Sequence, residues 1–196
     1  GKLEHFEINV KTIQNAGVSA LIVEDKKGLK KNSLFGLDVK QEQDSIKSFS
    51  KKIKIGKKVS NSEFMIVARI ESLILNKTVS DAYKRAKAYV SAGADGIMIH
   101  SKQKTPEEIF KFSKIFKKNF PNTPLIAVPS SYNKVTEKQL IDNGFNVVIY
   151  ANHLLRASYP AMKRTITSIL KNKRSYEIDN ELMSIKNILE LIPGTK

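Results

Sequence analysis

Three times along the chain, a helix-like segment ends in glycine, and a short apolar run follows within a few residues. The dipeptides at these points are Ala16-Gly17, Ala92-Gly93 and Asn143-Gly144, and the apolar runs that follow are residues 20–23, 96–99 and 147–150. Glycine is favoured just after a helix because it adopts a positive φ angle without steric strain. The repetition therefore predicts helices that alternate with strands.

Two further apolar runs, residues 64–68 and 125–128, bring the predicted strands to five. All five runs are continuously apolar rather than alternating, which is typical of parallel strands buried on both faces. Strict alternation of strand and helix predicts a parallel α/β fold. No glycine-rich dinucleotide-binding motif follows any strand, which favours a (β/α)8 TIM-type barrel over a doubly wound sheet.

A closed barrel of this type has eight strands and typically about 250 residues. This chain has 196 residues, and it opens on a helical pattern over residues 5–14. We therefore expect a barrel that lacks its first three strands, with five strand–helix units and then C-terminal helices. The expected division is a barrel part over residues 1–172 and a C-terminal helix and tail over residues 173–196.

Several helix boundaries are predicted from local signals. Residues Thr105–Glu108 have the residue types of a capping box, with Pro106 at the first helical position. Residues Thr136–Gln139 repeat the capping box before another apolar stretch. The spacing of apolar residues predicts two further helices, over residues 160–172 and 179–191.

The composition limits the classes of function. Lys and Arg number 34 against 19 Asp and Glu, a formal net charge of +15, and most of the positive charge is lysine. Proteins that read bases usually need arginine forks or aromatic platforms, so a solvated lysine-rich surface is favoured over a nucleic-acid interface. The apolar runs are far shorter than the roughly 20 residues that cross a bilayer.

Two absences narrow the chemistry further. The chain has no cysteine, which excludes a disulfide framework, a cysteine-based zinc site and a thiol nucleophile. It also begins without an apolar signal segment, so secretion is not expected.

Polar residues follow the predicted strands. Glu24 ends the first, Arg69 and Glu71 end the second, and His100 follows the third. In TIM-type barrels the chemistry lies at the carboxyl ends of the strands, so these side chains are expected to converge. The plain alternatives are a structural ion pair between Arg69 and Glu71 and an ordinary histidine at the rim of the barrel. The joint occurrence of all four residues at one predicted face favours a functional site.

The segment after the first strand, residues 24–36, contains four lysines, an asparagine, a serine and two glycines. Lysine supplies point charges for phosphate, and asparagine and serine supply hydrogen-bond donors. These residues predict a loop that closes over an anion and excludes water. An ordinary lysine-rich surface loop is the alternative.

The same segment, from Glu24 to Leu34, resembles the gating-loop motif E-D-K-x-x-x-K-x-N-S of phosphoenolpyruvate mutases. The resemblance continues through residues 68–72, 92–101, 150–156 and 190–195. Over nearly its whole length the chain is similar to the isocitrate lyase/phosphoenolpyruvate mutase superfamily.

This resemblance implies an isomerase that interconverts phosphoenolpyruvate and 3-phosphonopyruvate by intramolecular phosphoryl transfer. The step forms a carbon–phosphorus bond and belongs to phosphonate biosynthesis. The family also implies a magnesium cofactor, a cytoplasmic location and a homo-oligomer, dimer or tetramer, whose C-terminal helices are swapped between subunits. Neither nucleic acid nor a membrane is an expected partner.

In the loop, the resemblance assigns roles by position in the motif. Lys30, Asn32 and Ser33 match the gating-loop residues that engage the substrate, and Leu34 adjoins them as a substrate-binding residue.

At the strand ends, Arg69 matches the arginine that holds the substrate's anionic groups, and His100 matches the histidine near the transferring phosphoryl group. Glu24 matches a carboxylate of the magnesium shell that acts through water. The family's main magnesium ligands and its proposed nucleophilic aspartate are expected before Gly1. A polypeptide of these 196 residues alone is therefore expected to be inactive.

Other functions remain open. Phosphonopyruvate hydrolase shares most of the site, although the pattern Lys30-x-Asn32-Ser33 favours the mutase. The lyase branch of the superfamily uses a cysteine, which this chain lacks. A basic nucleic-acid-binding protein and an inactive barrel that serves as an interaction module are more distant alternatives.

Overall fold

The computed structural model describes residues 3–28, 41–192 and 194. The chain divides into two compact units, Gly1–Tyr150 and Ala151–Lys196. The first unit contains the sheet and its covering helices, and the second consists of helices. The predicted division into a barrel part over residues 1–172 and a tail over residues 173–196 stays a prediction.

Helices and strands alternate through the first unit, as predicted. They are α1 (Leu3–Asn15), β1 (Ala20–Glu24), α2 (Ile46–Val59), β2 (Met65–Ile70), α3 (Val79–Ser91), β3 (Gly96–Ile99), α4 (Glu107–Asn119), β4 (Leu125–Ala127), α5 (Glu137–Asp142) and β5 (Val147–Val148). Each strand lies within two residues of its predicted bounds.

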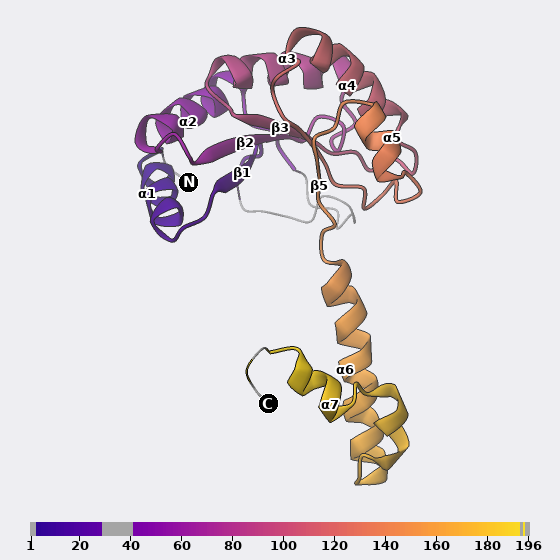
Figure 1. Cartoon of the computed structure of the whole chain (residues 1–196). Helices are drawn as coiled ribbons and strands as arrows, with labels where there is room; N and C mark the ends of the chain where they lie inside the picture. The colour runs from indigo at the N-terminus through magenta and orange to yellow at the C-terminus, as the bar shows by residue number, and fades with distance from the viewer. Residues whose placement is uncertain (1–2, 29–40, 193, 195–196) are drawn as a thin grey trace. The chain divides into compact units, whose positions relative to one another are not determined.

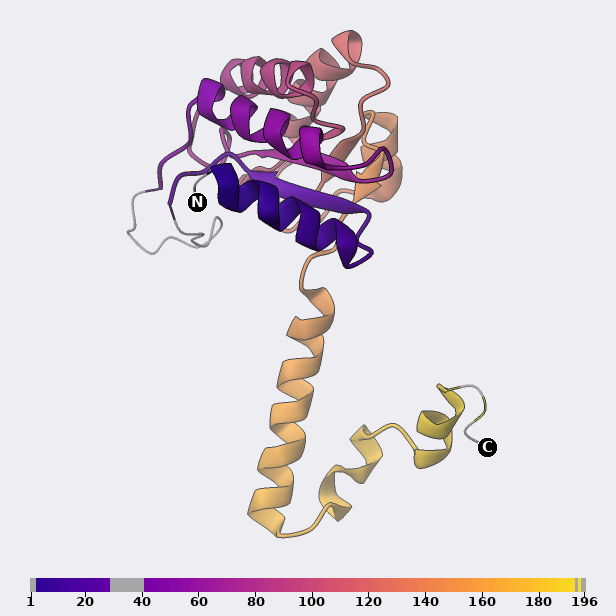
Figure 2. The ribbon, with the colours of Figure 1, turned by 90° about the vertical axis from the view of Figure 1, so that its left-hand side faces the viewer.

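The five strands form one parallel sheet in chain order, β1-β2-β3-β4-β5. Figure 1 shows α1 to α4 as an arc along one face of the curved sheet. Figure 2 shows α1 and α2 side by side over the strands, in agreement with their direct contact. A doubly wound sheet would reverse its strand order and have helices on both faces. The structure therefore confirms an α/β fold that winds as part of a barrel.

The core lies between the sheet and the helices. Its largest fully buried side chains include Phe49, Tyr89, Phe112 and Phe116 from α2, α3 and α4. All four residues of β3 are buried, as expected for a strand covered on both faces. The edge strands β1 and β5 are partly exposed, so the prediction of full burial is wrong for them. Among the described residues each edge strand pairs with one neighbour only, and this leaves its flank open.

Glycine ends the helices where predicted. Gly93 and Gly144 have φ angles of +102° and +81°, in the region that favours glycine. A Cβ atom on Gly144 would also lie 3.0 Å from Cγ of Lys117, so this turn packs closely on α4.

The two predicted capping boxes have different outcomes. The box of Thr136 and Gln139 is present at the start of α5. The box at Thr105 is wrong, because α4 begins at Glu107 and Pro106 occupies the cap position without a side-chain cap. Thr105 therefore lies one residue outside the position from which its hydroxyl could cap the helix.

The second unit contains α6 (His153–Asn172), the 3-10 helix η1 (Tyr176–Glu181) and α7 (Ile185–Glu190). The helix predicted over residues 160–172 begins earlier and includes Pro160 in its interior. The single helix predicted over residues 179–191 is wrong: the backbone is extended at Leu182, and Ser184 caps α7 anew. In the part of the chain that the structure describes, no helix combines the length and apolar character needed to cross a membrane.

Candidate active site at the strand ends

Parallel pairing brings the predicted strand-end residues together. Glu24 of β1 lies opposite Arg69 of β2 in the sheet register. Ile70 lies opposite Ile99, so the residues that follow them, Glu71 and His100, leave the sheet at the same level. The predicted convergence of these side chains at one edge is therefore present.

Four charged side chains form a closed ring of alternating sign, which we call the ionic ring: Glu24, Lys26, Arg69 and Glu71. Arg69 donates from Nε to Oε1 of Glu71 at 2.6 Å, and its Nη1 lies 3.2 Å from Oε1 of Glu24. Lys26 Nζ lies 2.9 Å from Oε2 of Glu71 and 3.6 Å from Oε2 of Glu24. Two cations and two carboxylates make the ionic ring formally neutral.

The ionic ring is nearly enclosed. The Glu71 side chain is fully buried, and the other three are at most 16% exposed. Charge interactions are strong in such surroundings because little water screens them. The ring contains the ion pair of Arg69 and Glu71 that the sequence offered as a plain structural alternative, and it extends that pair across two strands.

His100 lies beside the ionic ring and is 3% exposed. Burial is the main cause that lowers its pKa to about 4, and the positive charge of Arg69 acts in the same direction. The imidazole is therefore neutral at pH 7. Its Nδ1 atom is buried and has no hydrogen-bond partner among the described residues. An unsatisfied buried polar atom costs about 1–3 kcal/mol, so a partner that reached this nitrogen would be favourable.

The arrangement offers hydrogen-bonding groups to a small polar ligand. An arginine fork and a lysine supply charged donors, and a neutral imidazole supplies one donor and one acceptor. A cavity of about 300 Å³ reaches Glu24 and Lys26 from the side of α1, where Phe6 and Ile13 line it.

Sequence reasoning named Lys26 in the loop motif but did not place it in the site. Side chains alternate along an extended strand, so Glu24 and Lys26 point to one side and Asp25 to the other. This periodicity was the signal that could have identified Lys26.

The predicted loop residues Lys30, Asn32, Ser33 and Leu34 lie outside the described residues. Their assignment to the substrate site stays a prediction.

The magnesium prediction finds limited support in the residues present. Within residues 3–28, 41–192 and 194, no three His, Asp or Glu side chains are grouped to hold a metal ion. Magnesium prefers about six oxygen ligands, and Glu24 offers one carboxylate, whose oxygens already contact Arg69 and Lys26. The described residues do not by themselves fit this ion, and the role of Glu24 in a metal shell stays a prediction.

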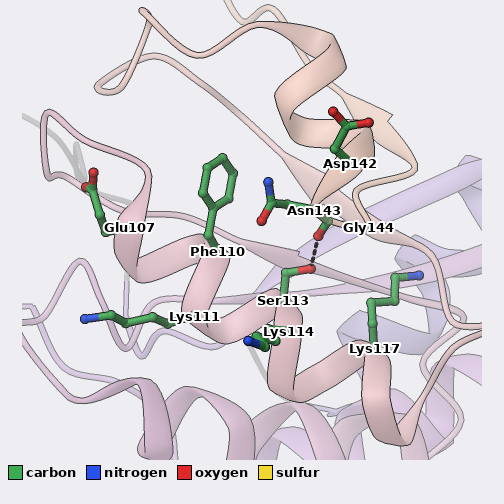
Figure 3. Close-up of a pocket in the computed structure, with 9 residues that line it drawn as sticks. All are labelled: Glu107, Phe110, Lys111, Ser113, Lys114, Lys117, Asp142, Asn143 and Gly144. Atoms are coloured by element: carbon green, nitrogen blue, oxygen red, sulfur yellow. Dashed lines mark hydrogen bonds between the residues drawn. The ribbon is translucent and has the colours of Figure 1, made fainter.

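A larger pocket of about 700 Å³ lies between α4 and α5 (Figure 3). Its lining residues are Glu107, Phe110, Lys111, Ser113, Lys114, Lys117, Asp142, Asn143 and Gly144. Figure 3 shows Ser113 bonded across it to the carbonyl of Asn143. It contains none of the predicted site residues and lies between two outer helices. The ionic ring and His100 are therefore the candidate active site.

Comparison with known proteins identifies the class. The chain matches the model of the family described as "Phosphoenolpyruvate phosphomutase" over residues 1–170. The chain belongs to this family.

The similar curated proteins include two with different activities. A phosphonopyruvate hydrolase from Variovorax sp. (strain Pal2) is 38% identical over 179 residues, which cover 90% of this chain and 60% of that protein. A phosphoenolpyruvate phosphomutase from Tetrahymena pyriformis is 36% identical over 183 residues, which cover 93% of this chain and 60% of that protein. The chain thus spans about 60% of the length of these relatives.

The similar solved structures likewise include both a mutase and a hydrolase. The crystal structure of a phosphoenolpyruvate phosphomutase from Streptomyces platensis subsp. rosaceus matches with a TM-score of 0.89 and 32% identity, over 97% of this chain and 65% of that one. A phosphonopyruvate hydrolase complexed with oxalate and Mg²⁺ matches with a TM-score of 0.83 and 34% identity, over 97% of this chain and 64% of that one.

Proposed function

We propose that the protein carrying this chain is a phosphoenolpyruvate mutase, which interconverts phosphoenolpyruvate and 3-phosphonopyruvate. The observation that carries the proposal is the ionic ring beside a neutral, buried His100 in a member of this family. The site offers the cationic donors of Arg69 and Lys26 to a small anion. The Nδ1 atom of His100 has no hydrogen-bond partner among the described residues.

The reaction is an isomerisation in which a phosphorus–oxygen bond breaks and a phosphorus–carbon bond forms. The phosphoryl group passes through a loose, metaphosphate-like transition state, which is stabilised by positioned donors. The pyruvate enolate must stay in place while its other end accepts the phosphoryl group. No net proton transfer is needed, so a histidine that stays neutral is compatible with the chemistry.

Arg69 is assigned to the anionic groups of the substrate, because a guanidinium fork binds a carboxylate or phosphoryl group through two parallel bonds. Glu24 and Glu71 orient this fork through Nη1 and Nε. His100 is assigned to an oxygen of the transferring phosphoryl group, bonded through Nδ1.

Exclusion of water decides between transfer and hydrolysis, because water would capture the phosphoryl group. The low exposure of the ionic ring and of His100 supports a dry site. In the proposal, Lys30, Asn32 and Ser33 complete the enclosure when substrate binds.

The second candidate is phosphonopyruvate hydrolase, in which water attacks phosphorus and the products are pyruvate and phosphate. The specific support for it is the 38% identity to the Variovorax hydrolase, which is similar to the identity with the mutases.

The products distinguish the two activities. The complete protein that carries this chain is incubated with 3-phosphonopyruvate and Mg²⁺ and followed by phosphorus NMR. A phosphoenolpyruvate signal supports the mutase, and inorganic phosphate with pyruvate supports the hydrolase. An Arg69→Ala variant is the control for a contaminating activity, and it is expected to be inactive. Recovery of unchanged substrate with the wild-type protein would exclude both functions.

A further inference from the structure

Asp25 stands between two members of the ionic ring but points away from it. Its neighbours Glu24 and Lys26 belong to the ring, while the Asp25 side chain is fully buried on the other side of the chain. The amide of Asp25 donates to the carbonyl of Arg69 at 3.0 Å, which continues the pairing of β1 with β2 to the level of the ring.

The Asp25 carboxylate accepts hydrogen bonds at both oxygens. Oδ1 accepts from the main-chain amide of Glu71 at 2.9 Å. Oδ2 accepts from the hydroxyl of Tyr89 at 2.8 Å and from Nη1 of Arg85 at 3.2 Å. Nε2 of Gln43 donates to Oδ2 at 2.9 Å and lies 3.1 Å from Oδ1. One side chain thus joins the end of β1, the end of β2, α3 and the segment at Gln43.

Arg85, one of the donors on α3, makes further hydrogen bonds that fix its position. Arg85 donates from Nη1 to the carbonyl of Asp44 at 2.8 Å and from Nε to Asp81 at 3.1 Å. Ser72, the residue after Glu71, donates to the same Asp81 carboxylate at 2.7 Å. The helix α3 therefore holds the chain after Glu71 directly, through Ser72, and the amide of Glu71 indirectly, through Asp25.

A buried network of this kind is not by itself a strong source of stability. Buried ion pairs incur a large desolvation cost, and apolar residues of similar volume often stabilise a protein equally well. The network also fixes position, because Asp25 directly follows Glu24 and accepts a bond from the amide of Glu71.

We propose that Asp25 is a positioning residue of the active site. By bonding the main chain of Glu71 and the α3 side chains Arg85 and Tyr89, it sets the ends of β1 and β2 so that the ionic ring closes and aims the Arg69 fork at the substrate. This inference rests on the proposed function for its kinetic effect, whereas the placement of Arg69 can be tested without it.

The kinetic test uses Asp25→Asn in the complete protein, with 3-phosphonopyruvate as substrate. Asparagine keeps the volume but presents an amide donor to the donors of Arg85, Tyr89 and Gln43. We expect the KM to rise at least tenfold, and the share of hydrolysis product to increase as the ring opens to water. Loss of folded enzyme alone would lower the apparent kcat and leave both quantities unchanged.

Two further variants calibrate the result. Tyr89→Phe removes one donor and is expected to raise the KM by a smaller factor, about threefold. Ser113→Ala removes a buried hydrogen bond to Asn143 far from the strand ends and is the matched control, with an unchanged KM.

A spectroscopic readout is independent of turnover. The Nε–H group of Arg69 donates to Glu71 at 2.6 Å, so it should give a protected signal in a proton–nitrogen spectrum. We expect Asp25→Asn and Tyr89→Phe to shift or broaden this signal and Ser113→Ala to leave it in place.

The outcomes separate the two proposals. A wild-type protein without turnover overturns the proposed function, and the Arg69 signal then still decides the positioning role. An unchanged KM and an unchanged Arg69 signal in folded Asp25→Asn would overturn the positioning role. If Asp25→Asn does not fold, the same two measurements on Tyr89→Phe decide, and wild-type values there would overturn it.

Discussion

At the scale of single residues, His100 has a pKa well below the ordinary value of a histidine. Burial, with a further contribution from Arg69, keeps it neutral, and the carboxylates of Glu71 and Glu24 only partly oppose this effect. A neutral imidazole with an unpartnered Nδ1 is suited to bond an oxygen without adding charge of its own.

The low pKa of His100 predicts that acid destabilises the fold. The pKa is about 4 in the folded state and 6.5 in the unfolded state, so the unfolded chain binds more protons as the pH falls through this window. The contribution of His100 is fully present above pH 6.5, and about 3 kcal/mol is lost by pH 4, at about 1.4 kcal/mol for each pH unit.

Urea unfolding at pH 7.5 and pH 4.5, at fixed protein concentration, measures this loss. His100→Gln should remove it, so the wild type should lose about 2–3 kcal/mol more than the variant between the two pH values. Asp25 acts in the opposite direction, because burial raises its pKa to about 6, but it is present in both proteins and cancels in the comparison. Equal losses in the two proteins would contradict the prediction.

Arg69→Lys should weaken substrate binding. A lysine keeps the charge but loses the fork, and it cannot contact both Glu24 and Glu71 through two separate nitrogens. We expect the KM for 3-phosphonopyruvate to rise about tenfold or more, which corresponds to the roughly 1.4 kcal/mol of one charge-assisted bond. Steady-state kinetics of the complete protein would show this, and an unaltered KM would count against a substrate contact for Arg69.

At the scale of elements, the start of a helix depends on which residue occupies the cap. Thr136 accepts a bond from the amide of Gln139, and the Gln139 side chain bonds back to the amide of Thr136. The residues Thr105–Glu108 have the same residue types, yet the helix there begins one position later. Sequence spacing alone did not distinguish the two cases.

The two threonines form a matched pair for mutation. Thr136→Ala should lower the free energy of unfolding by about 1 kcal/mol, because it removes the cap of the short helix α5. Thr105→Ala should change the free energy of unfolding by less than about 0.5 kcal/mol, since no side chain caps α4. Denaturant titrations measure both, and similar losses in the two variants would refute the distinction.

At the scale of the whole molecule, the second unit has more apolar surface than its own packing covers. No residue of α6 is buried, and the helix has a row of exposed apolar side chains at helical spacing: Leu155, Tyr159, Met162, Ile166 and Leu170. Soluble chains rarely leave such a continuous apolar face without a partner.

We therefore predict that the protein is a homo-oligomer and that α6 contributes to its interface. Sedimentation of the wild-type protein at micromolar concentration should give a dimer or tetramer. The double variant Met162→Lys, Ile166→Lys should shift the mass toward the monomer, because charged residues in an apolar interface are costly. Lys163→Glu, Lys171→Glu on the same helix changes charge without removing apolar area and is the control. A monomeric wild type would contradict the prediction.

By itself, the sequence determined the strand–helix alternation, the helix stops at Gly93 and Gly144 and the winding class, because these features depend on local backbone preference and on periodicity. It also brought Glu24, Arg69 and His100 to one edge, since all parallel strands present their carboxyl ends together. The residue types of the loop around Asn32 predicted an anion-binding loop, whereas the individual roles of Lys30, Asn32 and Ser33 came from family resemblance and stay predictions.

Only the tertiary structure decided that Lys26 and Glu71 close a ring, that His100 is neutral, and that Asp25 bonds the main chain of Glu71, 46 residues away. These properties depend on register between strands and on the water removed around each side chain. No short stretch of residues determines the strand register or the burial of a side chain, because both arise from the packing of segments that are distant in the chain.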